Sequence, residues 1–143
     1  MPLTDADMIA RLLLAAAIGG VLGAERERRR KSAGFRTNIL IAVGSCVFTL
    51  IALGFASGDP TRIPGQIVTG IGFLGGGVIL HSGAERVHGM TTAALIWVNA
   101  ALGTAAGAGQ MRLAIIGAGL TLGVMLVLGP LEREIEDHSK PRP

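Results

Sequence analysis

The side chains that could do chemistry in this sequence are few, and their spacing offers little catalysis. His81, Glu85 and His88 follow one another at intervals that would place them on one face of a helix, as metal ligands require. Glycines inside and after this segment favour a turn over a helix, so we predict no metal site there. Cys46 is the only cysteine and lies in an apolar stretch, which predicts a packing role.

Motifs typical of enzymes are also missing. The chain has no HExxH or GxSxG motif and no nucleophile beside a recognisable activating partner, so we predict no catalytic residue, no cofactor and no enzyme activity. Residues 70–75 spell the dinucleotide-binding pattern GxGxxG. That pattern works only where a strand ends and a helix begins, whereas this copy lies in the middle of an apolar stretch, so we reject nucleotide binding.

Polar side chains within apolar stretches are the better candidates for function, because such groups are costly inside a membrane. Gln66, Thr92 and Asn99 are of this kind. The alternative is hydrogen bonding between helices, worth about 0.6 kcal/mol per bond. Glu25 and Asp59 lie only at the ends of apolar stretches, and this lack of carboxylates at membrane depth argues against a pathway for cations.

The elements that position these residues follow from the composition. Of 143 residues, 50% are hydrophobic and 16% are charged, against about 25% charged in ordinary soluble domains. The uncharged stretches have the length of about 20 residues that a membrane helix needs, and they cover residues 37–58, 63–84, 89–111 and 113–131. A further span fits residues 4–24 if Arg11 extends to the membrane interface, and Thr4 with Asp7 matches a capping box at its start.

We therefore predict an all-α fold, a polytopic membrane helix bundle of about five transmembrane helices. Residues 1–131 would form the transmembrane domain, and residues 132–143 a charged, disordered cytoplasmic tail. With five spans, ten basic residues fall on one side of the membrane and three on the other. By the positive-inside rule the amino terminus lies outside and the carboxyl terminus in the cytoplasm. The basic loop from Arg26 to Arg36 would contact anionic lipid headgroups, and no nucleic acid.

Glycine is the other unusual feature, with 22 residues. Small residues allow helix backbones to approach closely in a membrane, so we predict helix packing at these positions, although a break around a ligand path is the alternative for residues 70–77. The predicted packing glycines are Gly19, Gly23, Gly70, Gly72, Gly75, Gly76, Gly77, Gly103 and Gly107.

Three ordered motifs resemble the transmembrane domain of the MgtC/SapB family, and the resemblance covers residues 8–131. The first includes Gly19, Gly23, Glu25, Arg26, Lys31, Gly34, Arg36 and Thr37. The second includes Asp59, Arg62, Gln66, Gly70, Ile71, Gly72, Phe73, Leu74, Gly75 and Gly77. The third includes Gly89, Thr91, Thr92, Ala93, Ala94 and Trp97. Phe35 and Met90 replace a usual leucine, and Gly76 replaces a usual alanine.

This resemblance implies a non-catalytic protein of the bacterial inner membrane that acts by binding other proteins in the membrane. Its partner would be a second copy or another membrane protein. The family is associated with adaptation to low magnesium and with survival of pathogens inside macrophages. Many members carry a soluble cytoplasmic domain after the last helix, where this chain ends. The alternative is a small channel or carrier with a pathway along Gln66, the glycines of residues 70–77 and Asn99.

Overall fold

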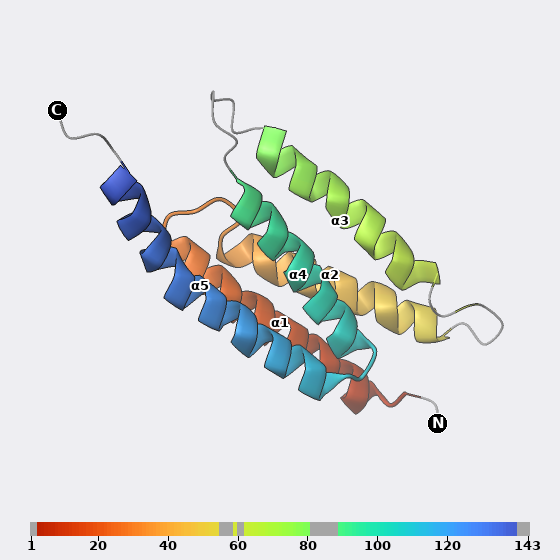
Figure 1. Ribbon diagram of the computed structural model, residues 1–143. Helices are drawn as coiled ribbons and strands as arrows, with labels where there is room; N and C mark the ends of the chain where they lie inside the picture. The colour runs from red at the N-terminus through yellow and green to blue at the C-terminus, as the bar shows by residue number, and fades with distance from the viewer. Residues whose placement is uncertain (1–2, 55–58, 60–61, 81–88, 140–143) are drawn as a thin grey trace.

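Five α-helices make up the computed structural model, which describes residues 3–54, 59, 62–80 and 89–139. The helices are α1 (Asp5–Arg28), α2 (Phe35–Gly54), α3 (Arg62–Leu80), α4 (Met90–Gly107) and α5 (Met111–Ser139). The described residues contain no strand, so the all-α prediction is confirmed. Consecutive helices run in opposite directions, and the two termini lie at opposite ends of the bundle (Figure 1).

Four segments are long and apolar enough to cross a membrane: Asp5–Arg28, Phe35–Gly54, Met90–Gly107 and Met111–Gly129. The helix α3 is not among them on its described residues, and the predicted span 63–84 ends in residues that lie outside the described part. The capping box predicted at the start of the first span is present. The Asp7 amide donates to Thr4 Oγ1 over 3.2 Å, and the Thr4 amide donates to the Asp7 carboxylate over 3.3 Å.

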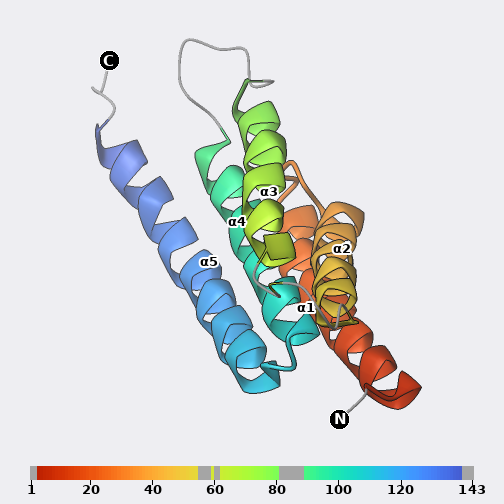
Figure 2. The same cartoon turned by 90° about the vertical axis from the view of Figure 1, so that its right-hand side faces the viewer.

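The central element of the bundle is α4, which contacts each of the other four helices. In Figure 1 it lies between α3 and α5, and Figure 2 shows α5 standing on the side away from α2. The main core is built from small and aliphatic side chains of α1, α2, α4 and α5, among them Ala15, Leu22, Cys46 and Leu95. The packing role predicted for Cys46 agrees with its complete burial.

Four of the glycines predicted to pack lie where another helix backbone crosses. A Cβ atom at Gly19 would come within 2.6 Å of the Asn38 carbonyl oxygen, and one at Gly107 within 2.7 Å of the Cys46 carbonyl oxygen. Gly23 meets the backbone of α2 at Phe35 in the same way, and Gly103 meets it at Ala42. The helices α1 and α4 therefore approach α2 more closely than any larger residue at these positions would permit.

The glycines of α3, apart from Gly75, do not pack against another helix of this chain. A Cβ atom added at Gly70, Gly72, Gly76 or Gly77 would meet nothing within 4 Å, and only Gly75 faces α4, at 3.6 Å from the Cβ atom of Ala93. The sequence shows that this helix is rich in small residues but not which way it is rotated. In the structure most of its glycines point away from the bundle.

The structure adds detail at two ends of the bundle, and at one of them it differs from expectation. The predicted disordered tail begins at residue 132, whereas α5 continues to Ser139. The segment Leu-Glu-Arg-Glu-Ile-Glu contains good helix formers, which favour such an extension. Arg11 extends to the carboxyl end of α4, where its Nη1 donates to the Gly107 carbonyl oxygen over 2.6 Å. The last carbonyls of α4 have no partner within their own helix, and the negative end of the helix dipole attracts a guanidinium.

Candidate functional site

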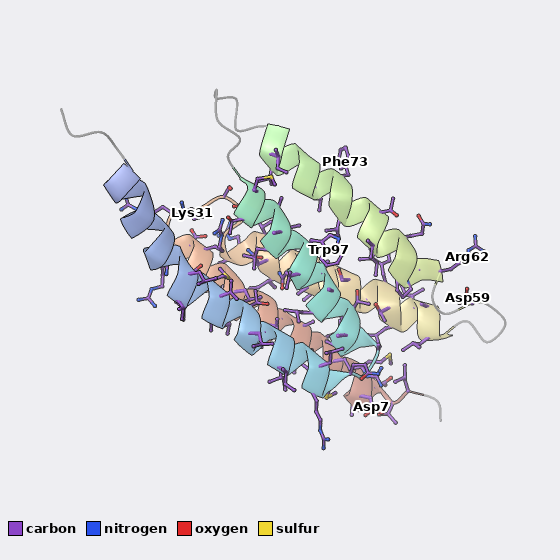
Figure 3. The ribbon with its side chains drawn as sticks, viewed as in Figure 1. Asp7, Lys31, Asp59, Arg62, Phe73 and Trp97 are labelled. Carbon is purple, nitrogen blue, oxygen red and sulfur yellow. The ribbon has the colours of Figure 1, made fainter. Side chains whose placement is uncertain are left out.

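Burial separates the predicted site residues into two groups. Glu25, Arg26, Thr92 and Asn99 are buried, with 8%, 5%, 4% and 0% of their surfaces exposed. The others lie at the surface of the chain: Lys31, Arg36, Thr37, Asp59, Arg62, Gln66, Thr91 and Trp97. Figure 3 shows how far apart Lys31, Trp97 and Arg62 lie along the bundle.

The buried group belongs to one polar cluster, which we define as Glu25, Arg26, Arg29, Asn38, Thr92 and Asn99. Its first link joins α1 to α4, where Arg26 Nη2 donates a hydrogen bond to Thr92 Oγ1. Ser32, in the turn after α1, donates to the same oxygen over 3.4 Å. Because Thr92 lies in the first turn of α4, this link fixes the start of that helix against the end of α1.

The second link joins α2 to α4 through two asparagines. Asn99 Nδ2 donates to the Asn38 carbonyl oxygen over 2.6 Å and lies 3.2 Å from Asn38 Oδ1. Asn38 Nδ2 in turn donates to the carbonyl oxygens of Ala33 and Gly34 over 2.5 and 2.9 Å. Both asparagines are fully buried. Asn38 is not among the predicted site residues, although it lies in a predicted span and meets the same criterion as Asn99.

The third link is an ion pair within α1, between Arg29 Nε and Glu25 Oε1. Three buried atoms of the polar cluster have no hydrogen-bond partner among the described residues: Glu25 Oε2, Arg26 Nε and Asn99 Oδ1. Buried polar atoms are costly when unpaired, so these three retain the capacity to bind water or another polar group.

The chemistry of the polar cluster is that of positioning. The cluster consists of separate polar pairs, of which one joins α1 to α4 and another joins α2 to α4. No group of three His, Cys, Asp or Glu side chains that could hold a metal ion occurs in the described part of the chain. The segment with His81, Glu85 and His88 lies outside the described residues.

The basic turn between α1 and α2 borders an open pocket of about 690 Å³. Its lining includes Glu27, Arg28 and Arg36. Glu27 Oε2 accepts a hydrogen bond from the Phe35 amide over 3.1 Å and so satisfies one donor at the start of α2. Arg28 and Arg36 place two positive charges at the edge of this pocket, beside the positive end of the α2 dipole.

A second surface feature lies on the side of α3 that faces away from the bundle. Residues at intervals of three and four share this side, and all five are exposed; we call them the α3 outer face: Gln66, Thr69, Gly70, Phe73 and Gly77. Among the residues that the structure describes, Phe73 has the most exposed large apolar side chain, at 82% (Figure 3). The structure therefore separates Gln66, on this outer face, from Asn99, which is buried between α4 and α2.

Comparison with known proteins gives matches to one family and to several of its members. The model of the MgtC family matches residues 12–134. The chain is 44% identical over 135 residues to a putative magnesium transporter, YhiD, of Escherichia coli, covering 88% of this chain and 62% of that protein. It is 46% identical over 107 residues to the protein MgtC of Salmonella typhimurium, covering 75% of this chain and 46% of MgtC.

The protein SapB of Bacillus subtilis is similar to the same extent, with 43% identity over 114 residues, covering 73% of this chain and 49% of SapB. The chain thus spans about half the length of the curated relatives that it matches. No solved structure matches it significantly.

Proposed function

The chain belongs to the MgtC family, and on that premise we propose that it is a non-catalytic protein of the bacterial inner membrane that acts by associating with a second copy or with another membrane protein. The physiological setting proposed for it is adaptation to low magnesium, including the survival of pathogens in their hosts. One relative, YhiD of Escherichia coli, is named a putative magnesium transporter.

The observation that carries this proposal is the α3 outer face. It combines glycines that have open space around them with two polar side chains, Gln66 and Thr69, on a helix whose surroundings are apolar. An amide exposed to hydrocarbon is costly, and a second helix would supply both hydrogen-bond partners and close backbone contact. Elsewhere in this chain, glycines such as Gly19 and Gly103 already hold helices together in this manner.

A bulky side chain on the α3 outer face tests the proposal. Gly70→Leu places an isobutyl group where nothing lies within 4 Å, so the fold of the single chain has room for it. We expect the wild-type protein to form a dimer in lipid nanodiscs, and Gly70→Leu to shift it to the monomer, as measured by mass photometry.

The matched control is Gly119→Leu, which also adds an isobutyl group in open space but on α5. It should leave the dimer intact. A wild-type protein that is monomeric and captures no membrane partner, or a dimer that both leucine variants retain, would contradict association through the α3 outer face.

The basic turn is proposed to hold anionic lipid headgroups. Support comes from the open pocket at Arg28 and Arg36, beside the first turn of α2. Phosphate groups bind well where guanidinium groups and a helix amino terminus converge. The double variant Arg28→Gln, Arg36→Gln tests this assignment. It should lose selective binding to phosphatidylglycerol vesicles, while its binding to phosphatidylcholine vesicles stays unchanged.

The second candidate is a channel or carrier for an ion or small solute. It is favoured by the similarity to YhiD, which is named a putative magnesium transporter. A liposome flux assay with Mg²⁺ and other small solutes distinguishes it from the first. Rapid flux that Gln66→Leu abolishes would establish the transport function in place of the association function.

A further inference from the structure

Between α3 and α4 lies an apolar crevice of about 330 Å³. Its walls are Pro64, Gly65, Ile67, Val68, Ile71, Trp97, Ala100, Ala101 and Thr104. We name it the α3–α4 crevice. Thr104 supplies the one hydroxyl group in this lining, and the other walls are aliphatic, aromatic or glycine.

Close contacts between the two helices extend from Gly75 to Ile71, which shares a core cluster with Ile96 and Ala100, and the crevice lies toward the start of α3. Gly75 lies in van der Waals contact with Ala93, whereas Gly65, near the start of α3, has nothing within 4 Å of its Cβ position. Trp97 and Val68 on its walls are 50% and 53% exposed, so the crevice opens sideways through the lateral surface of the helices. In Figure 3 Trp97 lies along α4 about midway between the ends of the helix. The opening therefore faces the hydrocarbon of a membrane and not one of its aqueous sides.

An apolar space of this kind must be filled in a membrane. Water would lose its hydrogen bonds there, and an empty space would lose the dispersion contacts of every wall atom. At about 30 Å³ for each water-sized group, the crevice of about 330 Å³ holds about ten non-hydrogen atoms. The α3 segment from Pro64 to Ile71 rises about 10 Å, which matches the length of a chain of that many atoms.

The dimensions decide between two classes of occupant. A transmembrane helix has a diameter of about 10–12 Å with its side chains, so its body would lie outside a crevice of about 330 Å³ and could insert only single side chains. A single flexible hydrocarbon chain can enter it. We propose that the α3–α4 crevice binds one acyl chain of a membrane phospholipid, and this assignment does not rest on the proposed function.

Trp97 provides a direct readout, because it is the only tryptophan and the chain has no tyrosine. The protein is reconstituted in phosphatidylcholine brominated at mid-chain, which quenches indole emission on contact. It is then diluted into an excess of unbrominated phosphatidylcholine in detergent micelles. Lipid that only surrounds the protein exchanges at once, so we expect a fast recovery of emission followed by a separate slow phase. The slow phase should correspond to one brominated lipid retained per chain.

Filling the crevice should remove the slow phase. Gly65→Leu adds an isobutyl group to its wall, and Ala101→Leu does so from the opposite helix and serves if the first variant does not fold. The matched control is Gly119→Leu on α5, which should keep the slow phase. A single fast recovery in the wild-type protein would overturn the proposal, and so would an unchanged slow phase in a folded crevice-filling variant.

The competing occupant, a second copy of the chain, has its own signature. Cysteine introduced as Gly65→Cys would form disulfides between copies in vesicles, whereas Cys46 is buried and stays unreactive. Such cross-links at Gly65, with none at the control Gly119→Cys, would overturn the lipid assignment.

Discussion

At the scale of single residues, neighbours of the same type have opposite environments. Thr91 and Thr92 are adjacent and both belong to the family motif, yet Thr91 is exposed and Thr92 is 4% exposed. Thr92 accepts the hydrogen bond of a buried guanidinium, that of Arg26. The hydroxyl at position 92 is therefore the acceptor that makes burial of the positive charge tolerable.

Replacement of that hydroxyl should destabilise the protein. Thr92→Val keeps the shape of the side chain and removes the acceptor for Arg26, so we expect a loss of about 2 kcal/mol in the free energy of unfolding, typical of a hydrogen bond to a charged group. Unfolding in mixed micelles with increasing sodium dodecyl sulfate, followed by circular dichroism, measures this loss.

Thr91→Val is the matched control, one residue earlier on the same helix and exposed. It should change the free energy of unfolding by less than about 0.5 kcal/mol, as surface substitutions usually do. Equal effects of the two valine variants would show that the link from Arg26 to Thr92 does not stabilise the bundle.

At the scale of helices, the glycines differ in whether the backbone of another helix lies against them. Gly103 and Gly107 lie against the backbone of α2 and set the distance between α2 and α4, while Gly119 on α5 has nothing within 4 Å. The same residue type therefore serves close packing on α4 and leaves an open surface on α5.

A single methyl group should reveal this difference. At Gly103 it would collide with the Ala42 carbonyl group, so we expect Gly103→Ala to cost about 1–3 kcal/mol of stability, the usual cost of overpacking. Gly119→Ala meets open space and should stabilise its helix by up to about 1 kcal/mol, because alanine favours the helix. The same detergent unfolding assay compares them, and a stabilising Gly103→Ala would contradict the close approach of α4 to α2.

The sequence predicts helix existence well and helix rotation poorly. The uncharged stretches and the glycine content identify the helices and most of their bounds, because each membrane crossing requires about 20 apolar residues. They do not tell which side of a uniformly apolar helix faces its neighbours, since lipid and protein are equally apolar. The outward glycines of α3 and the missed contact between Asn38 and Asn99 are two consequences. The interaction of Arg11 with Gly107 is a third, because it joins residues 96 positions apart.

At the scale of the whole molecule, the open question is which end of the bundle faces the cytoplasm. The directions of the helices and the distribution of basic residues both bear on it. The termini lie at opposite ends of the bundle (Figure 1), as an odd number of crossings requires. The end of α1 and the turn after it carry a cluster of basic residues that includes Arg28, Arg30 and Lys31. From the positive-inside rule we predict that this end of the bundle lies in the cytoplasm.

Labelling of single cysteines tests that orientation. Asp5→Cys and Asp59→Cys stand at one end of the bundle and Arg30→Cys at the other, and all three native residues are exposed. In intact spheroplasts a maleimide that cannot cross the membrane should label the first two variants and leave Arg30→Cys unlabelled until the cells are permeabilised. Cys46 is buried and gives a low background. The reverse pattern would place the amino terminus in the cytoplasm, and labelling of both Asp59→Cys and Arg30→Cys in intact cells would show that α2 does not cross the membrane. Since the loops between the helices are short and most of their basic residues lie in one of them, we expect a single orientation.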